Sequence, residues 1–283
     1  MKSLIRGARQ VARPAVLAAL HRRNLHASDR VTGSAPAIVS LTTFGVRLEA
    51  VHLAIESIAR GSVRPQRMIL WLDEPGALES LPAPLLRLKA RGLEIGLTDR
   101  MGPHAKYFPS LAVVDPSQVL VTADDDILYP RMWLERLLRG QALTPDAVVA
   151  NYVKVFQQEE GTQPAPYATW PAAWSTVPHR RNFALGVSGV VYPQRMIAAL
   201  RNAGQGFLTC SPRADDIWLH YVAVTERIAV RQAGRIPTHF ATLPAAGATL
   251  KSSNVDQGLN DVQINDTYDA DTLTWLAGIG AVQ

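Results

Sequence analysis

The chain has 283 residues, of which 47% are hydrophobic and 19% are charged, and it contains one cysteine. This is the composition of an ordinary globular protein, and no window approaches the ~20 apolar residues that a membrane span requires. The lone Cys210 excludes an intrachain disulfide and a thiolate-rich metal site, so we expect a free structural thiol and a cytoplasmic, reducing compartment.

The net charge of +5 belongs to the first thirty residues. Residues 1–30 hold seven basic residues against one aspartate, a balance of +6, which leaves −1 for residues 31–283. No zinc-finger spacing or basic recognition helix follows, so no nucleic-acid partner is expected. We predict a basic extension over 1–33. It is either an amphipathic helix on the inner face of an anionic membrane or an extension that is partly disordered or packed on the core.

Strands alternate with helices from residue 37 onward. Apolar runs at 37–44, 68–72 and 93–98 predict strands, whereas apolar residues at helical spacing over 48–58 and a short segment at 84–90 predict helices. This alternation is typical of βαβ units. It predicts one α/β domain over 34–283, with a mixed, mostly parallel sheet flanked by helices on both faces.

The run VLVTADDDILYP at 119–130 predicts a buried strand, an acidic tip and then a helix. If strand geometry continued through the tip, Asp124 and Asp126 would share one face and Asp125 the other. Carboxylates so placed repel each other, and a hard divalent cation such as Mg²⁺ or Mn²⁺ relieves the repulsion. The alternative is an acidic turn in which one aspartate caps the next helix. A strand's carboxyl end, where open α/β sheets bind ligands, favours the metal.

Lys106 follows the third predicted strand in a turn that contains Gly102-Pro103. At a strand's carboxyl end it could neutralise a phosphate, and the alternative is a solvated surface lysine.

The middle of the chain predicts a fifth strand at 147–155 and a long loop at 156–182. The loop carries Tyr167, Trp170 and Trp174, which are either platforms for sugar rings or anchors that pack the loop onto the domain.

Two glycines, Gly186 and Gly189, interrupt a weakly alternating run at 183–193. Glycine within a strand pattern predicts a close backbone approach to another group.

A second acidic cluster, Asp215 and Asp216, precedes an apolar-periodic helix. The helix dipole favours carboxylates at its N-terminus, and helix capping explains one of the two. We expect the N-terminal position to keep the pKa of the other low enough for it to serve as a deprotonated general base. The tail beyond 238 predicts a flexible closing segment. His239 within it is either a metal ligand or a structural histidine.

Six segments in this order resemble the GT-A fold glycosyltransferases, especially small bacterial enzymes that build capsule or other surface polysaccharides. The resemblance covers about 37–265. It is carried by IVSLTTF (38–44), ILWLDE (69–74), GPHAKYFPSL (102–111), VTADDDILYP (121–130), GVVYP (189–193) and ADDIW (214–218).

The resemblance implies a nucleotide-sugar donor, a divalent metal and a glycan or lipid-linked glycan acceptor. A nucleotide-binding part would span 34–130 and an acceptor-binding part 131–265. The donor would contact Thr42, Phe44, Arg47, Asp73, Lys106, Asp124 and Asp125. Asp124, Asp126 and His239 would hold the metal. Asp216 would be the base that deprotonates the acceptor hydroxyl, with Asp215 as the alternative.

Several alternatives stay open at this point. The Gln-x-x-Arg-Trp signature of processive synthases is absent, which favours transfer of single sugars. In a retaining enzyme Asp216 would contact substrate instead of acting as base. A sugar nucleotidyltransferase shares the sheet and the acidic tip, but residues 42–48 match its glycine-rich loop poorly. A non-catalytic glycan-binding module on the same fold is a further alternative.

Overall fold

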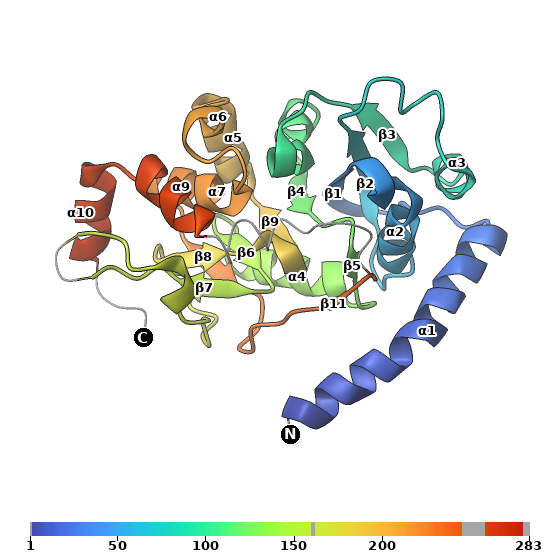
Figure 1. Cartoon of the computed structure of the whole chain (residues 1–283), viewed down its shortest axis with the longest axis horizontal. Coiled ribbons are helices and arrows are strands. Elements are labelled where there is room, and N and C mark those ends of the chain that lie inside the picture. The colour runs from blue at the N-terminus through green and yellow to red at the C-terminus, as the bar shows by residue number, and fades with distance from the viewer. Residues whose placement is uncertain (1, 160–161, 245–257, 280–283) are drawn as a thin grey trace.

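The computed structural model describes residues 2–159, 162–244 and 258–279. Its centre is a seven-stranded sheet in the order β10-β6-β9-β4-β1-β2-β3 (Figure 1). The strands of this sheet are β1 (Ala35–Thr43), β2 (Pro65–Leu72), β3 (Glu94–Leu97), β4 (Val119–Thr122), β6 (Val148–Ala150), β9 (Val190–Tyr192) and β10 (Val230–Gln232).

All neighbouring strands of the sheet run parallel except β9, which is antiparallel to both β4 and β6. Because β4, β1, β2 and β3 run in the same direction, their carboxyl ends lie along one edge. The predicted class, a mixed and mostly parallel sheet, is confirmed.

Helices cover both faces of the sheet. One layer holds α2 (Val51–Ala59), α3 (Ala83–Ala90) and α4 (Trp133–Leu143), and the other holds α5 (Gln194–Ala203) and α7 (Asp215–Thr225). Strand β1 contributes to both layers through its period of two. Val39 packs in the cluster that contains Ile55 of α2, whereas Ile38 packs in the cluster that contains Val222 of α7. The alternating pattern of the sequence therefore builds a three-layer core.

The prediction of one strand over 147–155 is wrong. Strand β6 ends at Ala150, and β7 (Val153–Val155) pairs with β8 (Asn182–Ala184) in a separate two-stranded sheet. The buried Asn151 separates them, and its amide donates to the carbonyl of Ser188 instead of continuing a strand. A second small sheet joins β5 (Ile127–Leu128) to β11 (Ala241–Thr242).

In its described residues, the predicted long loop at 156–182 has one 3₁₀ turn, Tyr167–Thr169. Tyr167 and Trp170 are buried against residues of α7 and of the chain's last two helices, so they anchor the loop. Trp174 is 62% exposed.

The expectation of a flexible tail is wrong for residues 258–279, and residues 245–257 of that tail lie outside the described residues. Two helices, α9 (Leu259–Thr267) and α10 (Ala270–Gly278), form because Ile264, Tyr268 and Leu276 bury themselves in the cluster around Trp170. The short helix α6 (Phe207–Cys210) precedes α7.

Helix α1 (Lys2–His26) runs along one side of the domain with its N-terminal end directed away from it (Figure 1). Its later part is attached specifically, because Leu20 packs with Leu53 and Leu128, and the Asn24 amide donates to the buried carboxylate of Glu56. None of the described helices is both long and apolar enough to cross a membrane.

Candidate active site

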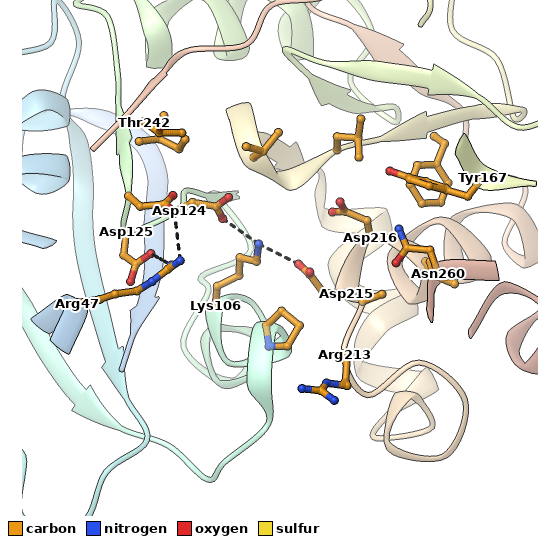
Figure 2. Close-up of a pocket in the computed structure, with 18 residues that line it drawn as sticks. Arg47, Lys106, Asp124, Asp125, Tyr167, Arg213, Asp215, Asp216, Thr242 and Asn260 are labelled. Atoms are coloured by element: carbon orange, nitrogen blue, oxygen red, sulfur yellow. Dashed lines mark hydrogen bonds and ion pairs between the residues drawn. The ribbon is translucent and has the colours of Figure 1, made fainter. Parts of the chain in front are cut away.

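A pocket of about 350 Å³ opens at the carboxyl end of β4. All five carboxylates of the two predicted acidic clusters line it, together with three basic side chains, Arg47, Lys106 and Arg213. Figure 2 shows the tip carboxylates on one side of the pocket and Asp216 on the other, with Lys106 between them. The fold therefore brings both clusters to one site, although 88 positions separate Asp126 from Asp215 in the numbering.

The acidic tip does not continue the strand, so the predicted alternation of its side chains is wrong. Asp125 is 6% exposed and accepts hydrogen bonds from Thr43 Oγ1 at 2.7 Å and from Arg47 Nη1 at 2.8 Å. Arg47 also lies 3.3 Å from Asp126 Oδ2. Adjacent carboxylates thus share one guanidinium, because the chain turns after Thr122.

The pKa of Asp126 is raised to about 6. Burial contributes most to this rise, followed by the negative charges of Asp124 and Asp125. A cation near Asp126 would favour its ionised form.

Lys106 links the two acidic clusters. Its Nζ lies 2.9 Å from Asp124 Oδ1 and 3.1 Å from Asp215 Oδ2, and the residue is 8% exposed. Burial alone would lower the pKa of Lys106, but the carboxylates of Asp124 and Asp215 outweigh it and raise that pKa well above its ordinary value. The reading of Lys106 as a solvated lysine is wrong: it is a buried, charged bridge.

Asp215 and Asp216 are the first residues of α7, as predicted, while Ala214 occupies the N-cap position without a side-chain hydrogen bond. Asp216 Oδ1 accepts a hydrogen bond from the backbone N–H of Gly186 at 2.9 Å. The expectation of a low pKa for Asp216 is wrong. Burial and then the charge of Asp215 raise that pKa, and they outweigh Lys106 and the hydrogen bond from Gly186.

The predicted close backbone approach at both glycines is confirmed. A Cβ atom on Gly186 would lie 3.0 Å from Lys106 Nζ and 3.1 Å from Asp216 Oδ1. Gly189 has a φ of +89°, and a Cβ there would lie 2.5 Å from the Trp133 ring. A side chain at Gly186 would displace these charged groups by a few tenths of an ångström, and a side chain at Gly189 would clash with Trp133 and strain the backbone.

Four predicted site residues do not line this pocket. Thr42 donates to the Trp71 carbonyl, and Phe44 is 49% exposed. Asp73 lines a separate open groove at the carboxyl ends of β2 and β3. His239 packs against Tyr152 with ring centroids 4.0 Å apart. Their proposed donor and metal contacts stay predictions.

Sequence reasoning did not assign Arg213, Asn260 or the Tyr167 hydroxyl to the site, although all three residues line the pocket. Arg213 adjoins the second acidic cluster, which is a local signal. Asn260 carried no such signal, because its position depends on the packing of α9.

The described side chains do not by themselves complete a metal site. Within the described ranges, no group of three or more His, Cys, Asp or Glu side chains could hold a metal ion. Asp124 and Asp126 nevertheless offer hard oxygen atoms to the pocket. These two carboxylates fit an ion such as Mg²⁺, which is commonly bound by one or two carboxylates together with phosphate oxygens of a substrate.

No protein-family model matches the chain, and the search of curated proteins finds no match. Among solved structures, a mannosyltransferase of Pyrobaculum calidifontis in complex with GDP-Man and Mn²⁺ is 12% identical, with a TM-score of 0.48 over 96% of this chain and 85% of that one. Glucosyl-3-phosphoglycerate synthase of Mycobacterium tuberculosis, in complex with Mn²⁺, UDP and phosphoglyceric acid, is 13% identical, with a TM-score of 0.48 over 88% and 80%.

S. aureus TarS in complex with UDP-GlcNAc is 12% identical, with a TM-score of 0.49 over 76% of this chain and 61% of that one. The structural neighbours thus include the class of protein that the sequence motifs resemble. At TM-scores below 0.5 they are too remote to assign an activity to this chain.

Proposed function

We propose that this protein is a metal-dependent glycosyltransferase that moves one sugar from a nucleotide-sugar donor to an acceptor hydroxyl. The observation that carries the proposal is the meeting of two carboxylate clusters in one pocket, one at the end of β4 and one at the start of α7. Such a site separates two tasks, because one cluster can hold a charged leaving group while the other handles a proton.

The donor would lie along the edge formed by the carboxyl ends of β4, β1, β2 and β3. Three strand spacings of about 4.8 Å separate β4 from β3, or roughly 14 Å. The diphosphate would sit near the acidic tip, and the nucleoside would extend toward Asp73 and the groove beside it. Arg47 would contribute positive charge at the phosphate end.

Asp124 and Asp126 are the residues proposed to hold the metal ion together with the donor's phosphate oxygens. When bound there, a divalent ion neutralises the negative charge of the leaving diphosphate. Lys106 keeps Asp124 in place and adds a second positive charge at the same end of the pocket.

Asp216 is proposed to accept the proton of the acceptor hydroxyl. A base works best when its pKa is near the working pH, and burial raises the pKa of Asp216 in that direction. The hydrogen bond from Gly186 fixes the orientation of the carboxylate.

The acceptor is proposed to be a glycan or a lipid-linked glycan of a bacterial surface polysaccharide. A lipid-linked acceptor fits the basic composition of α1, whose early residues carry positive charge that an anionic membrane surface would attract. We therefore propose peripheral contact of α1 with the inner face of the membrane.

Calorimetric titration of UDP, GDP, CMP and dTDP, each with and without Mn²⁺, tests the proposal. We expect one nucleotide to bind in a Mn²⁺-dependent manner, and the corresponding nucleotide sugar to release that nucleotide when acceptor is added. Absence of binding by all four nucleotides in both conditions would contradict a donor site.

The alternatives give different results in the same assay. A sugar nucleotidyltransferase would bind a nucleoside triphosphate and release pyrophosphate. A non-catalytic glycan-binding module would bind sugars without any nucleotide. Neither of these two functions requires a second carboxylate cluster with a raised pKa. For this reason we propose the glycosyltransferase instead of them.

A further inference from the structure

One polar side chain of the pocket has no hydrogen-bonding partner among the described residues. Asn260 is 8% exposed and lines the pocket from the first turn of α9. An amide group can donate two hydrogen bonds and accept two, and no described residue uses this capacity of the Asn260 side chain. Since the Asn260 amide faces the pocket (Figure 2), a molecule bound there would supply the missing partner.

Tyr167 stands beside Asn260 in a fixed orientation. Its backbone N–H donates to Asp261 Oδ1 at 2.6 Å, and Lys154 Nζ lies 4.0 Å from the centre of its ring. Trp170 and Phe183 pack against the same ring. Because its neighbours enclose the ring, Tyr167 cannot act as a stacking platform. It offers the pocket its hydroxyl group.

Three groups of complementary hydrogen-bonding character therefore face one part of the pocket. Figure 2 shows the Tyr167 hydroxyl, the Asn260 amide and the Asp216 carboxylate pointing to the same side. An amide donates and accepts, a phenol does both, and a carboxylate accepts. A sugar ring matches this set, since each of its hydroxyl groups can donate and accept.

The charge of this wall disfavours an anionic ligand. Asp215 and Asp216 begin the same helix, and the ammonium group of Lys106 is already shared between Asp215 and Asp124. Arg213 also lines the pocket, but a phosphate or carboxylate placed beside Asn260 would lie next to Asp216 and would be repelled by the ionised form of that side chain. A neutral polyol would not.

We propose that Asn260 and Tyr167 form the acceptor subsite, which binds a neutral sugar ring through its hydroxyl groups and places one hydroxyl at Asp216. The role in transfer rests on the proposed function, but the binding of a neutral sugar does not. Both residues contact the acceptor alone, so they determine acceptor affinity and leave donor affinity unchanged.

Binding of neutral sugars to the full-length protein tests the subsite. The probes are the methyl glycosides of glucose, galactose, mannose and N-acetylglucosamine, detected by saturation-transfer NMR, with and without nucleotide and Mn²⁺. The variants are Asn260→Ala and Tyr167→Phe, and the matched control is Asn265→Ala, an exposed asparagine of the same helix.

We expect at least one glycoside to bind, with its Kd raised about tenfold by Asn260→Ala, raised less by Tyr167→Phe and unchanged by Asn265→Ala. Nucleotide affinity should be equal in all variants. The subsite is overturned if no glycoside binds, if binding is indifferent to Asn260→Ala, or if only anionic sugars such as glucuronate bind.

A structural role for Asn260 is excluded in the same experiment. Because the amide has no described partner to lose, Asn260→Ala should unfold within about 1 °C of the unsubstituted protein, and a much larger drop would overturn the subsite. Failure of all nucleotides to bind, with Asn260-dependent glycoside binding intact, would remove the transferase proposal and keep the sugar site.

Discussion

The ammonium group of Lys106 lies 3.1 Å from the Asp215 carboxylate, and it reaches the acidic tip through Asp124 from the same position. One buried cation thus holds the end of a central strand and the start of a helix from the opposite half of the domain. The two acidic clusters form one electrostatic unit for this reason.

Replacing Lys106 should destabilise the fold as well as the site. Lys106→Met would leave Asp124 and Asp215 without their shared cation in a buried position, and we expect the free energy of unfolding to fall by about 3 kcal/mol. Denaturant unfolding measures the change. Arg139→Met is the control, because the Arg139–Glu135 pair is on the surface and is worth only about 0.3 kcal/mol. Equal effects of the two substitutions would contradict the bridging role.

Asp126→Asn should abolish Mn²⁺-dependent nucleotide binding and leave the protein folded. The amide keeps the size of the carboxyl group but loses the negative charge that a divalent cation requires. Calorimetry with Mn²⁺ provides the measurement, and the exposed Asp146→Asn serves as a control. Unchanged metal-dependent binding would place the ion elsewhere.

Asp216→Asn should reduce transfer by about a hundredfold or more with donor affinity retained, since an amide cannot accept the proton of the acceptor. In the unsubstituted protein, transfer should rise with pH as Asp216 loses its proton.

The raised pKa of Asp216 also affects the stability of the fold. Folding disfavours the ionised form of Asp216. The free energy of unfolding of the protein therefore falls as pH rises from the ordinary aspartate pKa toward the raised pKa of Asp216 in the folded state.

The variant should therefore be more thermostable than the unsubstituted protein at pH 8 by about 2 °C, and equal to it near pH 3, where both states bind the proton. Differential scanning calorimetry at the two pH values checks the sign. A less stable variant at pH 8 would refute the assignment of a raised pKa.

Gly186→Ala should impair the site through crowding alone. The added methyl group would lie 3.0 Å from Lys106 Nζ and 3.1 Å from Asp216 Oδ1, so both groups must shift by a few tenths of an ångström. We expect transfer to fall about tenfold, because catalysis is sensitive to small displacements of reacting groups. Gly278→Ala, where a Cβ meets no atom within 4 Å, should have no such effect.

Removal of residues 1–13 should weaken binding to anionic vesicles at least about tenfold, because four basic residues are lost and each is worth about 1 kcal/mol near such a surface. The truncation retains Leu20 and the residues that pack with it, so unfolding should not change. Cosedimentation with phosphatidylserine vesicles measures binding, and neutral vesicles are the control. Equal binding of both proteins would argue against membrane contact.

The strand and helix order was predictable because apolar periodicity is a local property. Strands β1, β2 and β4 and helices α2 and α4 follow directly from it, and so does the placement of the acidic tip at a strand's carboxyl end. The break at Asn151 was not predictable, because no glycine or proline marks it and the cause is a hydrogen bond to the distant Ser188.

Properties that depend on tertiary packing were missed or reversed. The N-terminal position of Asp216 on its helix suggested a low pKa, but burial by segments remote in sequence decides the outcome. The polar sequence of α9 gave little indication of a helix, and Asn260 reaches the pocket only because Ile264 and Tyr268 pack under the 156–182 segment.

The contact between α1 and β5 has a geometric consequence. Leu128, which packs against Leu20 of α1, follows Asp126 by two residues. The N-terminal helix and the acidic tip therefore cannot rotate independently. In the proposed membrane-bound protein, this packing would set the angle at which the pocket faces the membrane, and with it the height above the membrane of the acceptors that the pocket can reach.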